Sequence, residues 1–305
     1  MSLPNFLIVG VPKSATTSLH NYLSDHPQIY MPQKKDFNYF TRKYRAPNSA
    51  GPGDKKIVLD DDSGLADYEQ HFQEVNGEKA IGESSTSYFY FPECNKDIKA
   101  ALGDNVKIIV ALRNPIDRAF SNYMHLVREG RETLPFHEAL AQEETRREAH
   151  WSDFWRYKDH SLYAEKMQDC LDEYGAQNVK VLLYEDFAAN TLGVLQEVFR
   201  FLEVDPDFVP SNINIVYNKG GRYSSSYLRN LLKGKNKFRR TLKGVLPRSA
   251  LRPLKKLRSA LLEMNTAKTE RMDDKSRAML ADYFKDDKEA LAARFDLDIS
   301  KWKTN

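Results

Sequence analysis

Four short apolar segments along the chain are rich in β-branched residues and are bounded by polar positions. Such nearly unbroken runs are typical of strands that are buried on both faces of a parallel sheet. The sequence therefore predicts strands at Phe6–Val9, Lys79–Gly82, Val106–Leu112 and Val179–Tyr184.

Helical patterns lie between and after these apolar segments. The predicted helices are Thr16–Ser24, Asp67–Val75, Pro115–Val127, Pro135–Thr145, Leu162–Tyr174, Thr191–Leu202 and Asp273–Phe295. Strands that alternate with helices predict βαβ units with right-handed crossovers around a central parallel sheet. We therefore expect one α/β domain over residues 1–305, whose last third is mainly helical and lacks strands.

One connection, Thr41–Gly64, has the composition of a long loop, with Pro47, Gly53 and an acidic run at 60–62. Long connections without secondary structure are usually either functional or disordered. The pattern predicts a loop over about 41–64, which we interpret as either a substrate loop or a solvated insertion.

The composition is that of a soluble globular protein, with 41% hydrophobic and 29% charged residues. No segment approaches the roughly 18 consecutive apolar residues of a membrane span. The first residues carry neither a basic region nor a small-residue cleavage site, so we expect no secretory signal and a cytoplasmic location. Cys94 and Cys170 are too few for a metal cluster or a disulfide framework.

The net charge of +3 hides an asymmetry. The stretch from Phe208 to Leu262 holds 14 Lys and Arg residues and no Asp or Glu, which leaves −11 on the rest of the chain. Such a basic field attracts anions. Three interpretations of the segment at about 224–262 stay open: a solvated lid, a contact of 229–258 with an acidic membrane surface, or a grip on an anionic acceptor. Nucleic acid is disfavoured, because Phe238 is the only aromatic residue in 229–258.

A polar turn follows the first predicted strand and leads directly into a helix. Such a turn points backbone N–H groups at one spot, where the helix dipole adds positive potential. The candidate phosphate-binding residues are Lys13, Ser14, Ala15, Thr16, Thr17 and Ser18. A nucleotide triphosphate loop would require Gly at position 15 and Lys at position 16, so a magnesium-dependent ATPase or GTPase is disfavoured.

A second polar junction follows the strand at Val106–Leu112. Asn114 is a good N-cap, Pro115 is a good first helical residue, and Ser121 lies about two turns into the helix. Arg113 is left at the carboxyl end of a parallel strand, where open α/β sheets bind their ligands. Alone, this pattern is also compatible with a structural ion pair of Arg113.

Both junctions resemble motifs of sulfotransferases that use 3′-phosphoadenosine 5′-phosphosulfate. Residues 12–19 resemble the loop for the 5′-phosphosulfate, and Arg113 with Ser121 resembles the motif for the 3′-phosphate. A weaker match near the same phosphate comprises Lys219, Gly220, Gly221 and Arg222. The resemblance extends from Phe6 to Trp302. It implies a three-layer α/β/α fold of the P-loop type, this nucleotide as cofactor, and no metal.

The resemblance also suggests catalytic groups. Lys13 would stabilise the charge that grows on the leaving phosphate. Asp36 falls where the glycan-modifying branch has its basic Glu, Glu83 lies in a run that resembles a further family motif, and His125 matches a His of the glycan N-sulfotransferases. We rank Asp36 first as the base that takes the acceptor proton, Glu83 second and His125 third.

The acceptor is left open by the sequence. A glycan, a lipid and a small natural product all fit, with a hydroxyl or an amine as the attacking group. The alternatives to a sulfotransferase are a P-loop kinase-like phosphotransferase, which would need ATP and magnesium, and a non-catalytic module that binds anions or membranes through the basic segment. The oligomeric state is not indicated by any pattern.

Overall fold

The computed structural model describes residues 3–59, 64–215, 217, 222–223, 266–267 and 271–304. At its centre lies a five-stranded parallel sheet with the order β2-β3-β1-β4-β5. The strands are β1 (Phe6–Gly10), β2 (Ile29–Tyr30), β3 (Ala80–Ser84), β4 (Lys107–Leu112) and β5 (Val179–Leu183). The four predicted strands are confirmed, whereas β2 was missed because two residues show no periodicity.

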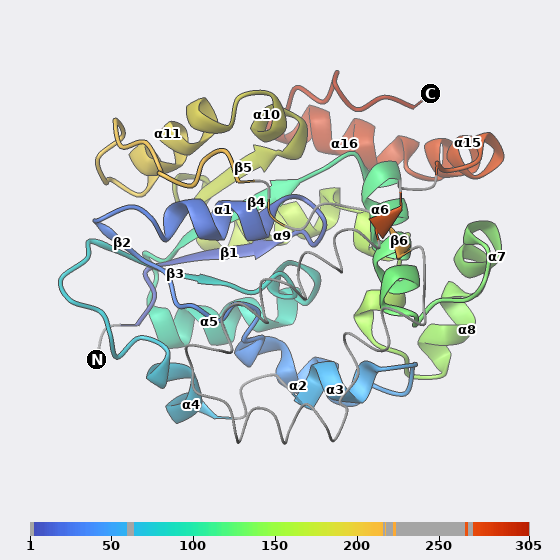
Figure 1. The fold of residues 1–305 in the computed structure, drawn as a ribbon, viewed down its shortest axis with the longest axis horizontal. Helices are drawn as coiled ribbons and strands as arrows, with labels where there is room; N and C mark the ends of the chain where they lie inside the picture. The colour runs from blue at the N-terminus through green and yellow to red at the C-terminus, as the bar shows by residue number, and fades with distance from the viewer. Residues whose placement is uncertain are drawn as a thin grey trace.

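Helices cover both faces of this sheet (Figure 1). Alternate residues of β1 face opposite sides: Phe6 and Ile8 pack in one apolar cluster, and Leu7 and Val9 pack in another. The first cluster involves α1 (Thr16–Leu23), α10 (Tyr184–Ala189) and α11 (Thr191–Phe201), and the second involves α5 (Asn95–Leu102) and α9 (Ala164–Tyr174). The predicted three-layer α/β/α fold is therefore confirmed.

A third apolar cluster lies beside the sheet and is built mainly from helices. It includes residues of α6 (Pro115–Glu129), α7 (Phe136–Ala141) and α15 (Asp274–Tyr283), and α8 (Glu143–Glu148) follows α7 in the chain. The helix predicted over 135–145 is two helices that meet at Gln142, and the one predicted over 273–295 is α15 followed by α16 (Lys285–Phe295). The fully buried Phe284 separates these last two helices.

The segment predicted as a loop over 41–64 is helical in part. It contains α2 (Arg42–Arg45) and α3 (Asp54–Leu59), and it is flanked by the 3₁₀ helix η1 (Tyr39–Thr41) and by α4 (Leu65–Gln70). The loop prediction was wrong because buried polar residues anchor the segment. Arg45 and Asp54 are 1% and 0% exposed, and such anchors leave no apolar period in the sequence.

Asp54 is the centre of a buried polar network. Its carboxylate accepts hydrogen bonds from the Ser152 N–H at 2.9 Å and from Trp155 Nε1 at 3.1 Å, and it forms an ion pair with Arg131. Nearby, Arg146 Nη1 pairs with Glu132 Oε2 at 2.6 Å. Through the side chain of Asp54, its first residue, α3 is hydrogen-bonded to the segment that follows α8.

The C-terminal part also contains a short pair of strands. β6 (Arg222–Tyr223) pairs antiparallel with β7 (Thr266–Ala267), so the expectation of a strand-free last third was wrong for two very short strands. β6 lies beside α6. Lys219, Gly220, Gly221 and the basic segment 224–262 lie outside the described residues. Within the described ranges, none of the helices is both long enough and apolar enough to cross a membrane.

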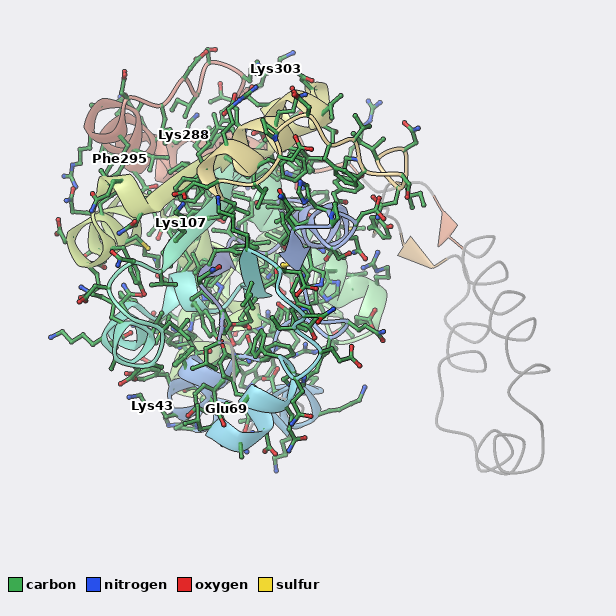
Figure 2. The ribbon with its side chains drawn as sticks, turned by 90° about the vertical axis from the view of Figure 1, so that its left-hand side faces the viewer. Lys43, Glu69, Lys107, Lys288, Phe295 and Lys303 are labelled. Carbon is green, nitrogen blue, oxygen red and sulfur yellow. The ribbon has the colours of Figure 1, made fainter. Side chains whose placement is uncertain are left out.

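The network around Asp54 gives a stability prediction. Asp54→Asn leaves the largely buried Arg131 without its charge partner, so we expect a loss of about 3 kcal/mol in the free energy of unfolding in urea. The matched control is Asp97→Asn. Asp97 pairs with Lys43 at 2.7 Å, and both side chains are about half exposed (Lys43 is labelled in Figure 2). That control should change stability by less than about 0.5 kcal/mol, and equal effects of both variants would contradict the prediction.

Candidate active site

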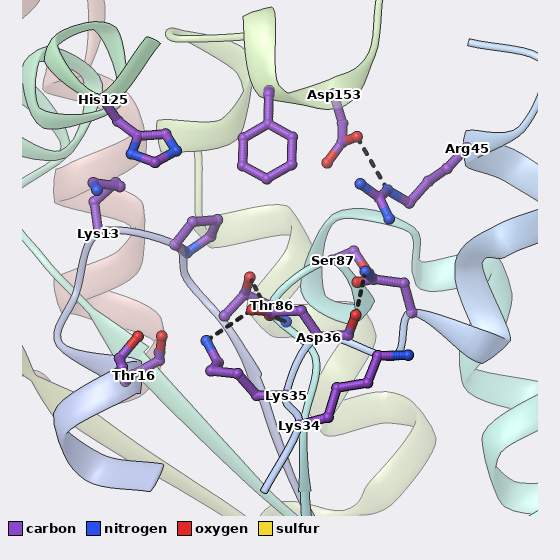
Figure 3. A pocket seen from close by; sticks show the side chains of 14 residues that line it. Lys13, Thr16, Lys34, Lys35, Asp36, Arg45, Thr86, Ser87, His125 and Asp153 are labelled. Atoms are coloured by element: carbon purple, nitrogen blue, oxygen red, sulfur yellow. Dashed lines mark hydrogen bonds and ion pairs between the residues drawn. The ribbon is translucent and has the colours of Figure 1, made fainter. Parts of the chain in front are cut away.

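A cavity of about 640 Å³ opens near the carboxyl ends of β1 and β3. Figure 3 shows side chains that line it from several parts of the chain. They include Lys13, Thr16, Lys35, Asp36, Thr86 and His125. The fold thus brings three of the four predicted catalytic residues, Lys13, Asp36 and His125, to one concave surface, together with Thr16 and Thr17 of the predicted phosphate loop.

The loop between β1 and α1 forms one side of the cavity. Lys13 and Ala15 both adopt positive φ angles, 76° and 61°, in the region that ordinarily favours glycine. This conformation lets α1 begin abruptly at Thr16. No side chain caps the helix, and its first turn contains no acidic residue. Ser14 Oγ is buried and has no hydrogen-bond partner among the described residues. The loop therefore offers unused donors and a positive helix end, as an anion site requires.

Lys13 is surrounded by like charges. Burial is the largest cause that lowers the pKa of its ammonium, and the charges of the nearby Arg128, Arg113, Arg118 and Lys35 add to it, so that the pKa is about 7. At neutral pH the group is therefore close to half protonated. A bound anion would reverse this effect by favouring the charged form.

Arg113 connects the two predicted phosphate motifs. Its Nη1 donates a hydrogen bond to the Lys13 carbonyl oxygen at 2.9 Å, and its guanidinium lies 4.4 Å from the centroid of the Tyr184 ring. Its buried Nε has no partner in the described ranges. The predicted helix start is also present, because the Asn114 side chain accepts a hydrogen bond from the Ile116 N–H.

The remaining predicted 3′-phosphate residues are only partly placed. Ser121 lies half-buried on α6, beside β6, which contains Arg222. Neither Arg113 nor Ser121 lines the 640 Å³ cavity. The sites predicted for the two phosphates are therefore adjacent but distinct, and the Arg113–Lys13 hydrogen bond lies between them.

Asp36 is held on the cavity wall by its own backbone and by Thr86. Its φ is 58°, and its N–H donates to the Ser84 carbonyl oxygen at 2.7 Å. Its Oδ1 accepts from the N–H and the hydroxyl of Thr86 at 3.4 and 3.3 Å, and its Oδ2 lies 3.0 Å from Lys35 Nζ. The side chain is still 39% exposed. The carboxylate is therefore both oriented and accessible.

Glu83 occupies a different environment. It is fully buried in β3, does not line the cavity, and accepts a hydrogen bond from the Tyr68 hydroxyl at 3.2 Å. Burial raises the pKa of its carboxyl to about 8, although the nearby hydroxyl groups of Ser85, Tyr88 and Tyr68 oppose the shift. At neutral pH Glu83 is mostly protonated and lies away from the cavity.

His125 projects from α6 toward the cavity. Its Nδ1 lies 3.1 Å from Arg128 Nη2, which donates to it, and its ring centroid lies 6.4 Å from that of Phe154.

Sequence reasoning missed Thr86, Arg45, Asp153 and Phe154, which line the same cavity. Only the position of Thr86, three residues after Glu83, offered a signal. The other three lie in segments that no motif singles out.

Comparisons with known proteins agree with this architecture. A family model described as Sulfotransferase family matches residues 4–208. The chain is 33% identical to a sulfotransferase from Alicyclobacillus acidocaldarius, whose crystal structure superposes with a TM-score of 0.78 and 99% coverage of both chains.

Two curated relatives are more distant. Carbohydrate sulfotransferase 15 of Homo sapiens is 26% identical over 248 residues, which is 67% of this chain and 44% of the relative. Membrane-associated sulfotransferase kil1 of Dictyostelium discoideum is 32% identical over 126 residues, which is 40% of this chain and 23% of the relative. The chain thus spans less than half the length of these curated relatives. The family match over two thirds of its residues nevertheless decides its membership: this chain belongs to the sulfotransferase family.

Proposed function

We propose that the chain transfers a sulfuryl group from 3′-phosphoadenosine 5′-phosphosulfate to a hydroxyl group of a glycan acceptor. The observation that carries the proposal is the contact between the two phosphate motifs. Arg113 donates to the Lys13 carbonyl oxygen at 2.9 Å, although the residues are a hundred positions apart. A ligand with phosphates at both ends of a ribose suits two neighbouring cationic sites. The similarity to carbohydrate sulfotransferase 15 supports a glycan acceptor.

The donor set fits a polyanionic nucleotide. Ser14 Oγ and Arg113 Nε are buried donors that lack partners within the described part of the chain, and unpaired buried polar groups are costly without a ligand. In our proposal the 5′-phosphosulfate is held by Lys13, Ser14, Ala15, Thr16, Thr17 and Ser18. The 3′-phosphate is held by Arg113 and Ser121, with further contacts from Lys219, Gly220, Gly221 and Arg222.

In the transfer, the acceptor oxygen forms a bond to sulfur while the bond from sulfur to the bridging phosphate oxygen breaks, and that oxygen keeps the electron pair. Lys13 and the amino end of α1 stabilise the charge that develops on the leaving phosphate. Asp36 takes the proton from the attacking hydroxyl. We place the proton on Asp36 because its carboxylate lines the cavity, whereas Glu83 is buried and mostly protonated, and the Nδ1 atom of His125 accepts from Arg128.

A kinase-like phosphotransferase is disfavoured by the position of Lys13 in the loop and by the family match. If the chain were a non-catalytic anion-binding module, the oriented carboxylate of Asp36 would have no role. The cytoplasmic location and a contact of 229–258 with acidic membrane lipid remain predictions.

The pKa of Lys13 predicts a pH-dependent affinity. Lys13 is charged below about pH 7 and neutral above it, and an anion binds the charged form. The dissociation constant of adenosine 3′,5′-bisphosphate should therefore rise about tenfold per pH unit above 7.5 until the pKa of the complex is reached. The ligand phosphates are already ionised there, since their second pKa is about 6.

Isothermal titration calorimetry between pH 7.5 and 9 measures this dependence. The control is Lys13→Arg, whose guanidinium stays charged throughout and should give a flat profile. A flat profile in the unmodified protein would show that Lys13 does not titrate against the ligand.

The role of Asp36 is tested by Asp36→Asn. The amide keeps the size and the Thr86 contact but loses the basic oxygen, so kcat should fall by about 10²- to 10⁴-fold while the bisphosphate binds unchanged. Transfer of labelled sulfate to a panel of oligosaccharides measures kcat. The matched variant Glu83→Gln mimics an already neutral carboxyl and should retain activity within about threefold at pH 7. The opposite ranking of the two variants would assign the proton to Glu83 instead.

A further inference from the structure

The wall of the cavity opposite Lys13 is lined by a different set of side chains. Arg45, at the end of α2, and Asp153, in the 3₁₀ helix η4 (Asp153–Trp155), face the cavity there (Figure 3). Phe154 lines the same cavity. None of these residues has a place in the donor site or the proton transfer proposed above, so this wall is available for the other substrate.

Charges on this wall are paired within the protein. Arg45 Nε lies 3.2 Å from Asp153 Oδ1, and the two side chains are only 1% and 7% exposed. On the neighbouring wall, Lys35 and Asp36 form a second pair at 3.0 Å. Lys34 is exposed, where solvent weakens its field. These two ion pairs are each neutral as a unit, and the remaining lysines that line the cavity are the exposed Lys34 and Lys13, which belongs to the proposed donor site.

Phe154 adds a fixed apolar surface. Its ring lies 6.0 Å from the guanidinium carbons of both Arg45 and Arg131, and 6.4 Å from the His125 ring. Arg131 is in turn fixed by its ion pair with Asp54. The Phe154 ring therefore lies close to two guanidinium groups and still borders the cavity.

An aromatic ring beside a carboxylate and a guanidinium matches the surface of a sugar. The C–H face of a pyranose is apolar and suits an aromatic ring, whereas adjacent hydroxyls donate to a carboxylate and accept from a guanidinium. A uronic acid carries a carboxylate that Asp153 would repel, and Arg45 is already neutralised by Asp153.

We propose that Arg45, Asp153 and Phe154 form the acceptor subsite and that it selects an uncharged sugar ring over the corresponding uronic acid. This inference rests on the proposed function, because it assigns the acceptor of the same cavity. The pair Arg45–Asp153 binds neighbouring hydroxyls, Phe154 supports the ring, and Asp153 discriminates against acidic rings.

Matched methyl glycosides test the selection. Methyl β-D-glucoside and methyl β-D-glucuronide differ only at C6, and the corresponding galactose derivatives form a second pair. Each is titrated into protein saturated with adenosine 3′,5′-bisphosphate. In at least one pair the neutral glycoside should bind at least tenfold more tightly than its acid. Equal binding, tighter binding of the acids, or no binding of any of the four would overturn the inference.

Two variants separate the roles of the residues. Asp153→Asn should reduce the preference for the neutral glycoside to less than threefold, because the repelling charge is gone. Phe154→Leu should weaken the binding of the neutral glycoside at least tenfold, because the aromatic surface is lost while the Arg45–Asp153 pair stays in place. Asp97→Asn makes the same chemical change in the exposed pair with Lys43. This control should leave unchanged both the affinity for the neutral glycoside and the preference over its acid. An unchanged affinity in Phe154→Leu, or an unchanged preference in a folded Asp153→Asn, would contradict the assignment.

Bisphosphate binding distinguishes the two levels of the proposal. If the unmodified protein fails to bind adenosine 3′,5′-bisphosphate, the proposed function fails and the acceptor inference fails with it. If the bisphosphate binds and the acidic glycosides are preferred, only the acceptor inference fails. Retained bisphosphate affinity in each variant also shows that the variant is folded.

Discussion

The concentration of positive charge at the carboxyl edge of the sheet is the constraint on which the site depends. Burial and, in second place, the nearby Arg128, Arg113, Arg118 and Lys35 together lower the pKa of Lys13 to about 7. Arg118 is fully buried, and it donates hydrogen bonds to two neutral groups, the Ser161 hydroxyl at 2.6 Å and the Tyr157 carbonyl oxygen at 2.8 Å. Such a cluster is unfavourable without counter-charge. A bound ligand with several phosphate charges would relieve this repulsion, and the relief would add to its affinity.

The rest of the fold keeps this edge in place. Both sheet faces are covered by apolar helices, so the loops after β1, β3 and β4 emerge from a rigid frame. A polar network centred on Asp54 and Glu132 holds the opposite wall of the cavity, which carries Arg45 and Asp153. Lys13 on one wall of the cavity has Arg113, Arg118 and Arg128 near it, whereas other walls carry the ion pairs Arg45–Asp153 and Lys35–Asp36. In our proposal this contrast separates a donor that carries phosphates from an acceptor that carries hydroxyls.

Sequence patterns could predict the sheet and the family because both depend on local signals. An apolar strand, a polar turn and a helix start are adjacent in the chain, as at Lys13 and at Arg113. The walls of the cavity depend instead on contacts between distant segments. Arg45 and Asp153 are 108 positions apart, and each looks like an ordinary surface charge in the sequence. Glu83 illustrates the converse case, since its motif is recognisable but its burial, and hence its raised pKa, follows only from the packing around β3.

The central claim is that Arg113 and the Lys13 loop bind the two ends of one nucleotide. Calorimetric affinities of adenosine 3′,5′-bisphosphate and adenosine 5′-phosphate, for the unmodified protein and for Arg113→Met, test it most directly. We expect the missing 3′-phosphate to weaken binding about a hundredfold in the unmodified protein, the magnitude of a bidentate charged contact, and by less than about threefold in the variant. If the unmodified protein binds both nucleotides equally, or if Arg113→Met weakens both by the same factor, Arg113 does not read the 3′-phosphate and the account is contradicted.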